Sequence, residues 1–396
     1  MKFCVVIMDG ASGWPLPQRG NKTCLELAHT PTLDAMAARG QMGMAFTVPP
    51  GMEPSSACAC MSVMGYDPLI YYKGRASIEA RSMGIPVHSD EMVFRCNLVT
   101  ILDGIMVSYS SGHISTPEAK AIIESLNREL GSDRVIFFPG VSYRHICKLK
   151  GGGISPDLIC TPPHDITDKP VADFLPRGKG SEILRQLMSK SEAVLSHHPV
   201  NMERKKQGKL PATTIWLFWP SGQIPEMPSF QKEYGLRASL TSGVDLLRGL
   251  AEMAAMEVLQ INGVTDDLDN DYAAQAAGAL KALERNDVVI IHIEAPDEMG
   301  HRGAVDDKIR AIELIDNEVM NRIYSLGQDN LKVLVMPDHP TPIEIKTHCA
   351  DPVPFLIWGR GVVNNGCHRF TEMEAGRTGF VVQPGYKLMR EFLKDD

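Results

Sequence analysis

Residues 333–342 read Val-Leu-Val-Met-Pro-Asp-His-Pro-Thr-Pro, and this stretch decides the fold. The four apolar residues at its start are typical of a buried parallel strand, which would deliver Asp338 and His339 at its carboxyl end. Sheets of α/β proteins place their chemistry in the loops at that edge, and a carboxylate beside a neutral imidazole is a good ligand pair for a first-row metal. One Asp-His pair is equally typical of an ordinary loop, so the metal interpretation depends on matching ligands elsewhere in the chain.

Two more apolar runs lead to side chains of the same kind. Residues 3–8, Phe-Cys-Val-Val-Ile-Met, predict a buried strand that ends at Asp9, although the following glycine makes a simple turn an equal alternative. Residues 287–294 predict another buried strand, and Asp297 and His301 come shortly after it, four residues apart. These segments supply the partners that the first stretch needs.

The ligand-type side chains are too many for one tetrahedral site. The expected set consists of Asp9, Asp297, Asp338, His301, His339 and His348. Three carboxylates and three imidazoles suit two neighbouring divalent ions, each of which holds both ligand types. Two such ions would serve phosphoryl transfer, because one lowers the pKa of a serine hydroxyl beside it and both neutralise charge on the transferring group.

A pair of serines opens residues 53–65, a run of small residues that is compatible with a helix. A serine at a helix start is in most proteins a cap for a free backbone N–H. The same position favours an alkoxide and a bound phosphate, because the free N–H groups and the helix dipole face it. Ser56 is therefore a candidate nucleophile as well as a candidate cap. Cys58 and Cys60 are too close together for a chelating CxxC pair and are interpreted as small packing residues.

Length, charge and cysteine content limit the class of protein. The chain has 396 residues, so two domains are expected. The formal net charge is -8 and the longest basic run is Arg204-Lys205-Lys206, which disfavours nucleic acids and anionic membranes as partners. The apolar start is too short for a signal-peptide core, and no apolar run approaches a membrane span. Nine scattered cysteines fit a reducing compartment, so a cytoplasmic location is expected.

The pattern changes after about residue 74. The following segments predict strands at 93–100, 135–138 and 214–219 and helices at 116–130 and 181–195. They indicate a second α/β domain, with clusters of arginine and histidine between its elements. Arginines in such number usually form a solvated surface. The functional alternative is that they bind phosphate or carboxylate in a bidentate manner.

Several ordered motifs resemble a known family. They are Asp9-Gly10, Thr30-Pro31-Thr32-Leu33-Asp34, Gly65-Tyr66-Asp67-Pro68, Tyr72-Lys73-Gly74-Arg75, Phe94-Arg95-Cys96-Asn97-Leu98-Val99-Thr100, His164-Asp165-Ile166-Thr167, Asp297-Glu298-Met299-Gly300-His301, Asp338-His339 and Asp351-Pro352-Val353-Pro354. Over nearly its whole length the chain is similar to the archaeal-type cofactor-independent (2,3-bisphosphoglycerate-independent) phosphoglycerate mutases, which belong to the alkaline phosphatase superfamily.

The resemblance implies a fold and an activity. The fold is α/β, with an alkaline-phosphatase-like core at 1–74 and 235–396, in which helices flank a parallel-dominated sheet, and an inserted α/β substrate-binding domain at 75–234. The implied activity interconverts 3-phosphoglycerate and 2-phosphoglycerate through a phosphoserine. Two divalent ions would serve it, with manganese as the first choice and magnesium, cobalt or zinc as alternatives, and no organic cofactor. The oligomeric state is left open.

The resemblance also assigns the site residues. It gives one ion to Asp9, Ser56, Asp338 and His339, and the other to Asp297, His301 and His348. Ser56 would carry the phosphoryl group. Catalytic roles fall to His164 and Asp165, and substrate binding falls to Arg75, Arg95, His113, Arg144, Arg204 and Arg248.

The sequence departs from the family around the nucleophile. The family usually reads Pro-Gly-Ser-Asp there, whereas this chain has Pro54-Ser55-Ser56-Ala57, and its Ser-Ala pair resembles the phosphatases of the superfamily. A glycine-rich turn of the family is replaced by residues 218–222, Phe-Trp-Pro-Ser-Gly. A metal-dependent phosphatase, or a mutase for another phosphorylated small molecule, is therefore the alternative. A binding module with structural metals is a third interpretation, which the intact serine opposes.

Overall fold

Packing divides the chain into two units. The structure, a computed structural model, describes residues 1–151, 153–155 and 158–394. One unit combines Met1–Tyr72 with Glu226–Asp396, and the other is Lys73–Pro225, here called the insert. The sequence predicts the domain boundaries at 74/75 and 234/235. Its assignment of metal binding to the core domain and of substrate binding to the inserted domain stays a prediction. Within the described residues, no helix combines the length and the apolar character that a bilayer crossing needs.

Strand β1 (Lys2–Met8) lies within the eight-stranded sheet of the first unit, whose order is β13-β2-β12-β11-β1-β10-β8-β9. It runs parallel to both neighbours, so that Val5 lies opposite Ile290 on one side and Leu334 on the other. The other strands are β2 (Gln41–Ala45), β8 (Ala238–Thr241), β9 (Glu257–Val258), β10 (Val288–Ile293), β11 (Leu331–Met336), β12 (Val353–Gly359) and β13 (Val381–Val382). The parallel strands β1, β10 and β11 are buried, which is why each is predominantly apolar.

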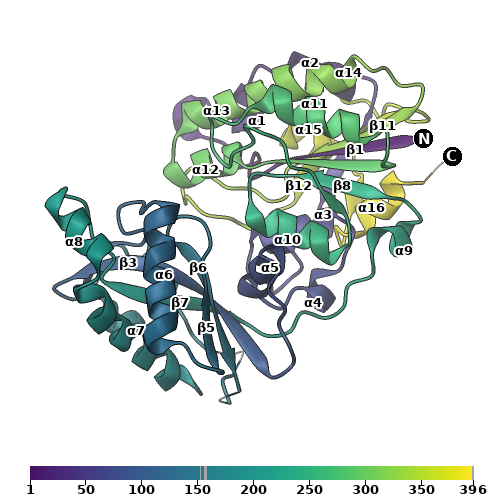
Figure 1. The fold of residues 1–396 in the computed structure, drawn as a ribbon. Coiled ribbons are helices and arrows are strands. Elements are labelled where there is room, and N and C mark those ends of the chain that lie inside the picture. Colours follow the sequence, from purple (N-terminus) through teal and green to yellow (C-terminus); the bar gives the residue numbers. More distant parts are fainter. Residues whose placement is uncertain (152, 156–157, 395–396) are drawn as a thin grey trace. The chain divides into compact units, whose positions relative to one another are not determined.

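Helices cover both faces of this sheet, with α11 and α13 on one face and α10 on the other (Figure 1). Cys4, Val6 and Met8 point to a core shared with α2, α11 and η4, whereas the Phe3 ring lies 5.5 Å from the Phe392 ring of α16. The helices are η1 (Pro17–Arg19), α1 (Cys24–Leu27), α2 (Pro31–Ala37), α3 (Ser56–Val63), α4 (Pro68–Tyr71), α9 (Phe230–Tyr234), α10 (Asp245–Met253), α11 (Tyr272–Ala282), α12 (Ala295–Arg302), α13 (Val305–Leu314), the π-helical η4 (Ile315–Met320), α14 (Asn321–Tyr324), α15 (Glu372–Arg377) and α16 (Lys387–Phe392).

The insert is built on a five-stranded antiparallel sheet around β3 (Glu91–Leu102), with the order β4-β3-β6-β5 and β7 also paired with β3. Helices α6 and α7 pack against it (Figure 1). A bulge interrupts the pairing of β3 with β7, where Trp219 has a positive φ of 50°. The remaining elements are α5 (Arg75–Ser82), β4 (Ile105–Ser108), α6 (Thr116–Leu130), β5 (Val135–Phe138), β6 (Arg144–Lys150), η2 (Pro163–Ile166), η3 (Val171–Phe174), α7 (Ser181–Ser196), α8 (Pro199–Lys206) and β7 (Thr214–Ser221).

Candidate functional site

The carboxyl ends of three adjacent parallel strands bring the predicted ligands together. Asp9 follows β1, Asp297 lies in the first turn of α12 just after β10, and Asp338 follows β11. These three carboxylates are at most 2% exposed. Because β1 lies between β10 and β11 and runs parallel to both, its end must lie beside theirs. The sheet therefore concentrates three buried carboxylates at one edge.

The first ligand group consists of Asp9, Asp338 and His339, which are all buried. One donor atom from each lies within 4.8 Å of the others. The His339 Nε2 atom is 3.3 Å from Asp338 Oδ2 and 3.6 Å from Asp9 Oδ1. Asp338 is held in place, because its Oδ1 accepts a hydrogen bond from the Gly10 N–H at 3.2 Å and its carbonyl accepts one from Thr47. This geometry suits one divalent cation.

The second ligand group is formed by Asp297 with three histidines. Donor atoms of Asp297, His339 and His348 lie within 4.8 Å of one another. The His301 Nε2 atom lies 3.1 Å from Asp297 Oδ2 and 2.9 Å from His348 Nε2. The other ring nitrogen of His301 contacts the Lys346 carbonyl at 2.9 Å, and such an outer contact orients a metal-binding imidazole. His339 lies between the two groups and could serve either.

The two serines at the start of α3 have different roles: one caps the helix, and the other faces the ligand groups. Ser55 is the N-cap, and its side chain accepts a hydrogen bond from the Cys58 N–H. Ser56 is the first helical residue, and its Oγ lies 3.2 Å from His339 Nε2. Because Ser55 supplies the cap, the Ser56 hydroxyl is available to face the ligand groups at the positive end of the helix.

The charges of this site fit bound cations. Burial, followed by the neighbouring Asp338 and Asp297, raises the pKa of Asp9 well above its ordinary value. Its Oδ1 atom is buried and has no hydrogen-bond partner among the described residues. A buried carboxylate oxygen without a partner is costly, and a divalent ion would remove that cost. The carboxylate and imidazole donors thus fit the metal dependence that the sequence predicted.

The pKa values of His339 and His301 are shifted in opposite directions. Burial lowers the pKa of His339 to about 4, so this imidazole is neutral and can donate its lone pair. Burial also acts against the protonated form of His301, but the hydrogen bond and charge of Asp297 outweigh it and raise the pKa of His301 to about 9. In the absence of a cation, the proton on His301 compensates the charge of Asp297, and a divalent ion would replace that proton.

Sequence reasoning missed two residues at this centre. His292 Nε2 lies 2.7 Å from Asp9 Oδ2, and Cys60 Sγ donates a hydrogen bond to Asp338 Oδ2 at 3.3 Å. In the sequence, the first lies within an apolar run and the second within a run of small residues. The available signal for the first was a histidine inside the buried run at 288–293, and the signal for the second was its place one helical turn after Ser56.

Two of the predicted substrate arginines are joined through Glu79 in the insert. Arg75 Nε donates to Glu79 Oε1 at 2.9 Å, and Arg95 pairs with Glu79 Oε2. Arg95 also donates to Asn97 at 3.3 Å. Arg95 is 7% exposed and lies in the sheet, whereas Arg75 is half-buried at the start of α5. Glu79 therefore fixes both guanidinium groups.

Aromatic rings connect Arg75 with other predicted residues. The Arg75 guanidinium lies 4.4 Å from the centre of the Trp219 ring, and His164 packs edge-on against the same ring at 5.9 Å. Tyr143 contacts His113 at 6.2 Å and lies below the Arg144 guanidinium at 5.9 Å. Stacking on a ring orients a guanidinium, and a guanidinium binds carboxylate and phosphate in a bidentate manner. The structure thus places these predicted residues on connected parts of the insert.

The remaining predicted residues differ from one another in burial and in their partners. Arg204 is 3% exposed and donates to Glu118, to the Leu210 carbonyl and to the Ser111 carbonyl, so three of its five N–H groups already have partners within the protein. Asp165 is exposed, with its Oδ1 3.7 Å from His164 Nε2. Arg248 lies on α10 in the first unit and donates to the Ser242 carbonyl. Its substrate role stays a prediction, as do the roles of all the site residues.

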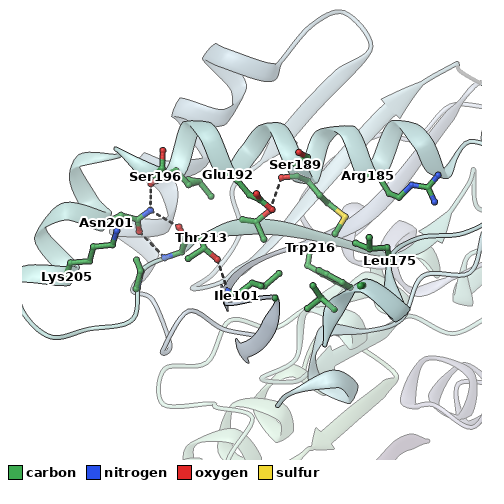
Figure 2. Close-up of a pocket in the computed structure, with 18 residues that line it drawn as sticks. Ile101, Leu175, Arg185, Ser189, Glu192, Ser196, Asn201, Lys205, Thr213 and Trp216 are labelled. Atoms are coloured by element: carbon green, nitrogen blue, oxygen red, sulfur yellow. Dashed lines mark hydrogen bonds between the residues drawn. The ribbon is translucent and has the colours of Figure 1, made fainter. Parts of the chain in front are cut away.

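The insert also contains a cavity of ≈ 730 Å³ between α7 and the sheet. Trp216, Ile101 and Leu175 form an apolar wall, and Arg185 and Lys205 lie at opposite ends (Figure 2). None of the predicted catalytic or substrate-binding residues lines it among the residues described. The cavity is therefore separate from the contacts that join Arg75 to Glu79 and Trp219.

Fold and site together define the class. An α/β chain that gathers buried aspartate, histidine and serine side chains at the ends of parallel strands is a metal-dependent enzyme. A family model described as 2,3-bisphosphoglycerate-independent phosphoglycerate mutase matches residues 37–201. A Methanothrix thermoacetophila protein of that name is 46% identical over 98% of this chain and 99% of its own length. A Geobacter sulfurreducens protein, named as a probable enzyme of this kind, is 41% identical over 99% of this chain and 100% of its own.

Solved structures agree with these sequence comparisons. A Pyrococcus horikoshii protein superposes with a TM-score of 0.82 at 25% identity, covering 100% of this chain and 98% of its own. The cofactor-independent phosphoglycerate mutase of Thermoplasma acidophilum has the same fold, with a TM-score of 0.65 at 24% identity and 99% coverage of both chains. The chain belongs to the family of 2,3-bisphosphoglycerate-independent phosphoglycerate mutases. The recognised family and the predicted α/β fold are thereby confirmed.

Proposed function

We propose that this chain interconverts 3-phosphoglycerate and 2-phosphoglycerate, and that Ser56 carries the phosphoryl group between the two hydroxyls of glycerate. The observation that carries the proposal is the position of Ser56, whose Oγ lies 3.2 Å from His339 Nε2 at the N-terminus of α3. The support from relatives is the name of the Methanothrix protein, which is 46% identical over almost the whole chain.

The two ligand groups would hold two divalent ions. Asp9, Ser56, Asp338 and His339 are proposed for one ion, and Asp297, His301 and His348 for the other. Manganese is the first candidate, and magnesium, cobalt and zinc are alternatives, because mixed carboxylate and imidazole ligands accept all four. When bound, these ions would supply charge neutralisation of the phosphate and a lower pKa of the serine hydroxyl.

The chain's own residues prepare the transfer. Ser56 Oγ gives up its proton and attacks phosphorus in line, the bond from phosphorus to the glycerate 3-oxygen breaks, and that leaving oxygen takes up a proton. The attack occurs at a helix N-terminus where free N–H groups and the dipole favour the phosphate charge. Ser55 keeps its capping bond to the Cys58 N–H, so the attack costs the helix no cap. The bonds from Gly10 and Thr47 keep Asp338 fixed during the reaction. The other hydroxyl of glycerate then takes the phosphoryl group from Ser56.

The insert would bind the glycerate. Arg75 and Arg95 are proposed to recognise its carboxylate or its phosphate, since guanidinium groups bind both in a bidentate manner. Their shared contact with Glu79 holds them in position before substrate arrives. His164, beside Trp219, is proposed to take part in proton transfer together with Asp165. His113, Arg144, Arg204 and Arg248 are the further candidates for substrate contacts.

An enolase-coupled assay tests the proposal. Protein loaded with manganese, magnesium, cobalt or zinc is given 3-phosphoglycerate, and both 2-phosphoglycerate and free phosphate are measured. We expect isomerisation that exceeds phosphate release and that Ser56→Ala abolishes. Ala57 replaces the acidic residue that follows the nucleophilic serine in the family, so the alternative function is a phosphatase. Phosphate release that exceeds isomerisation would establish this alternative instead. The expected cytoplasmic location stays a prediction.

A further inference from the structure

Cys60 lies inside the candidate metal centre, although its neighbours in sequence suggested packing. It is on α3, one helical turn beyond Ser56, and it is fully buried. Its Sγ contacts Asp338 Oδ2 at 3.3 Å. By contrast, the Cys58 sulfur contacts the Met52 sulfur at 3.9 Å and belongs to a small apolar cluster. Of these two thiols, it is Cys60 that contacts a carboxylate of the candidate metal centre.

A third ligand group is formed by Asp9, Cys60 and His292. One carboxylate oxygen, the thiol sulfur and one ring nitrogen lie within 4.8 Å of one another, and all three residues are buried. Around a tetrahedral zinc ion, ligand atoms at the usual bond lengths of about 2.0 to 2.3 Å lie about 3.5 Å apart. Shifts of about 1 Å would therefore bring the three atoms onto one ion.

The two carboxylate oxygens of Asp9 lie beside different histidines. Its Oδ2 lies 2.7 Å from His292 Nε2, whereas its Oδ1 lies 3.6 Å from His339 Nε2 and has no hydrogen-bond partner among the described residues. One carboxylate can thus contribute an oxygen to the His339 side and the other oxygen to the His292 side. The third group is consequently distinct from the first, even though they share this aspartate.

The surroundings of His292 are those of a metal-binding imidazole. Its Nδ1 lies 3.0 Å from Ser242 Oγ, and Gln275 donates a hydrogen bond to its carbonyl at 2.9 Å. A hydroxyl oxygen at this place can accept a hydrogen bond from Nδ1–H, and in that tautomer the Nε2 lone pair is free for a cation. A second buried oxygen without a partner among the described residues, Glu294 Oε2, lies 3.5 Å from His292 Nε2. The environment therefore supplies both a contact that orients the imidazole and a carboxylate oxygen that a cation would satisfy.

We propose that Asp9, Cys60 and His292 form a third divalent-cation site, and that the thiol makes this site prefer a thiophilic ion such as zinc. On binding, the sulfur–hydrogen bond of Cys60 breaks, the proton leaves to solvent and a sulfur–metal bond forms. One thiolate and one carboxylate then balance the two charges of the ion, with a neutral imidazole as the third ligand. Soft thiolate ligands favour zinc and cobalt over magnesium or manganese. The inference does not depend on which substrate the enzyme accepts.

Cobalt spectroscopy of the full chain tests this site without an activity measurement. Wild-type protein, Cys60→Ser and the matched control Cys58→Ser are each loaded with Co²⁺, and the near-ultraviolet spectrum is recorded. We expect a thiolate-to-cobalt charge-transfer band in the wild type and in Cys58→Ser, and no such band in Cys60→Ser. An equally strong band in Cys60→Ser, or its absence in the wild type, would overturn the proposal.

Zinc binding to the wild-type protein gives a second test that needs no variant. X-ray absorption at the zinc edge of the zinc-loaded protein, which averages over all bound zinc ions, should detect a sulfur scatterer at about 2.3 Å. Metal analysis should find one zinc equivalent more in the wild type than in Cys60→Ser, with circular dichroism confirming that both are folded. Nitrogen and oxygen scatterers alone around zinc would contradict a Cys60 ligand, even if the serine variant failed to fold.

Discussion

Replacement of Glu79 by glutamine is expected to loosen the insert and to disturb both predicted substrate arginines. Glu79 is 6% exposed and pairs with Arg95, which is 7% exposed, and with Arg75 at 2.9 Å. Glu79→Gln keeps the side-chain shape and leaves the Arg95 guanidinium buried without its carboxylate. Breaking one side of a buried ion pair costs about 3–5 kcal/mol. Because Asn97 still accepts a hydrogen bond from Arg95, we expect about 3 kcal/mol.

Hydrogen-exchange mass spectrometry measures this loss in the insert alone. Peptides from β3 of the variant should exchange faster than those of the wild type at pH 7, by the factor that corresponds to about 3 kcal/mol, or on the order of a hundredfold. The matched control is Glu182→Gln, which removes an exposed ion pair with Arg185 at 3.5 Å and should cost less than about 1 kcal/mol. Equal exchange in the two variants would refute the reasoning.

The effect of Glu79→Gln should also depend on pH. Burial acts to raise the pKa of Glu79, but Arg95 and Arg75 outweigh it and hold this pKa below the ordinary value of 4.5. The folded state therefore gains stability from the carboxylate above about pH 4.5 and loses it as the pH falls through the lowered pKa. The difference between wild type and variant should shrink at acidic pH. A constant difference down to acid unfolding would contradict the ion-pair explanation.

Three further predictions concern stability, substrate binding and metal. Burial lowers the pKa of His145 to about 3, so wild-type stability should fall as the pH drops from 6.5 towards 3, because the unfolded chain binds the proton first. His145→Asn, which keeps an acceptor for the Gly140 N–H, should flatten this pH dependence in urea unfolding, and an unchanged slope would oppose it. Trp219→Leu removes the ring 4.4 Å from Arg75 and should raise KM for phosphoglycerate about fivefold with little change in kcat. An unchanged KM would show that the ring does not contribute to substrate binding. A chelator should lower the unfolding temperature of the wild type more than that of Asp338→Asn, because ions stabilise only the folded site, and equal shifts would argue against this ligand.

The ligands at the strand ends could be predicted because parallel strands leave a continuous apolar signal. The runs before Asp9 and Asp338 are recognisable in the sequence, and the rule that function lies at the carboxyl edge predicts that their ends meet. The short strand β8 (Ala238–Thr241) carries too few residues for such a signal, and the pairing of β2 with β12 depends on contacts between distant segments. The larger fold was thus predictable where strands are long and buried.

The sequence could not divide the roles of neighbouring residues. Ser55 and Ser56 are equally good caps by composition, and only the direction of each hydroxyl, towards Cys58 or towards His339, separates them. The local sequence around Cys60 indicates only packing. Its contact with Asp338 joins segments 278 residues apart, so no local pattern predicts it. Such assignments depend on tertiary geometry that no local pattern contains.

The insert shows the same limit for charged residues. An arginine pattern predicts anion recognition, but it does not reveal that Arg95 is already paired with a buried glutamate. Arg204 is enclosed by Glu118 and two backbone carbonyls, which the sequence presents only as a basic run. Arg248 was grouped with these residues by resemblance and lies on α10 of the other unit. Burial and pairing decide which arginines are available, and both are properties of the folded chain.

Trapping of the phosphoserine tests the central claim most directly. Metal-loaded wild type, Ser56→Ala and Ser55→Ala are exposed briefly to 3-phosphoglycerate, quenched in acid and digested, and the peptide that contains both serines is sequenced by mass spectrometry. We predict phosphate on Ser56 in the wild type and in Ser55→Ala, which loses only a helix cap worth about 1 kcal/mol, and none in Ser56→Ala. Phosphate on Ser55, or isomerisation that persists in Ser56→Ala, would contradict the account.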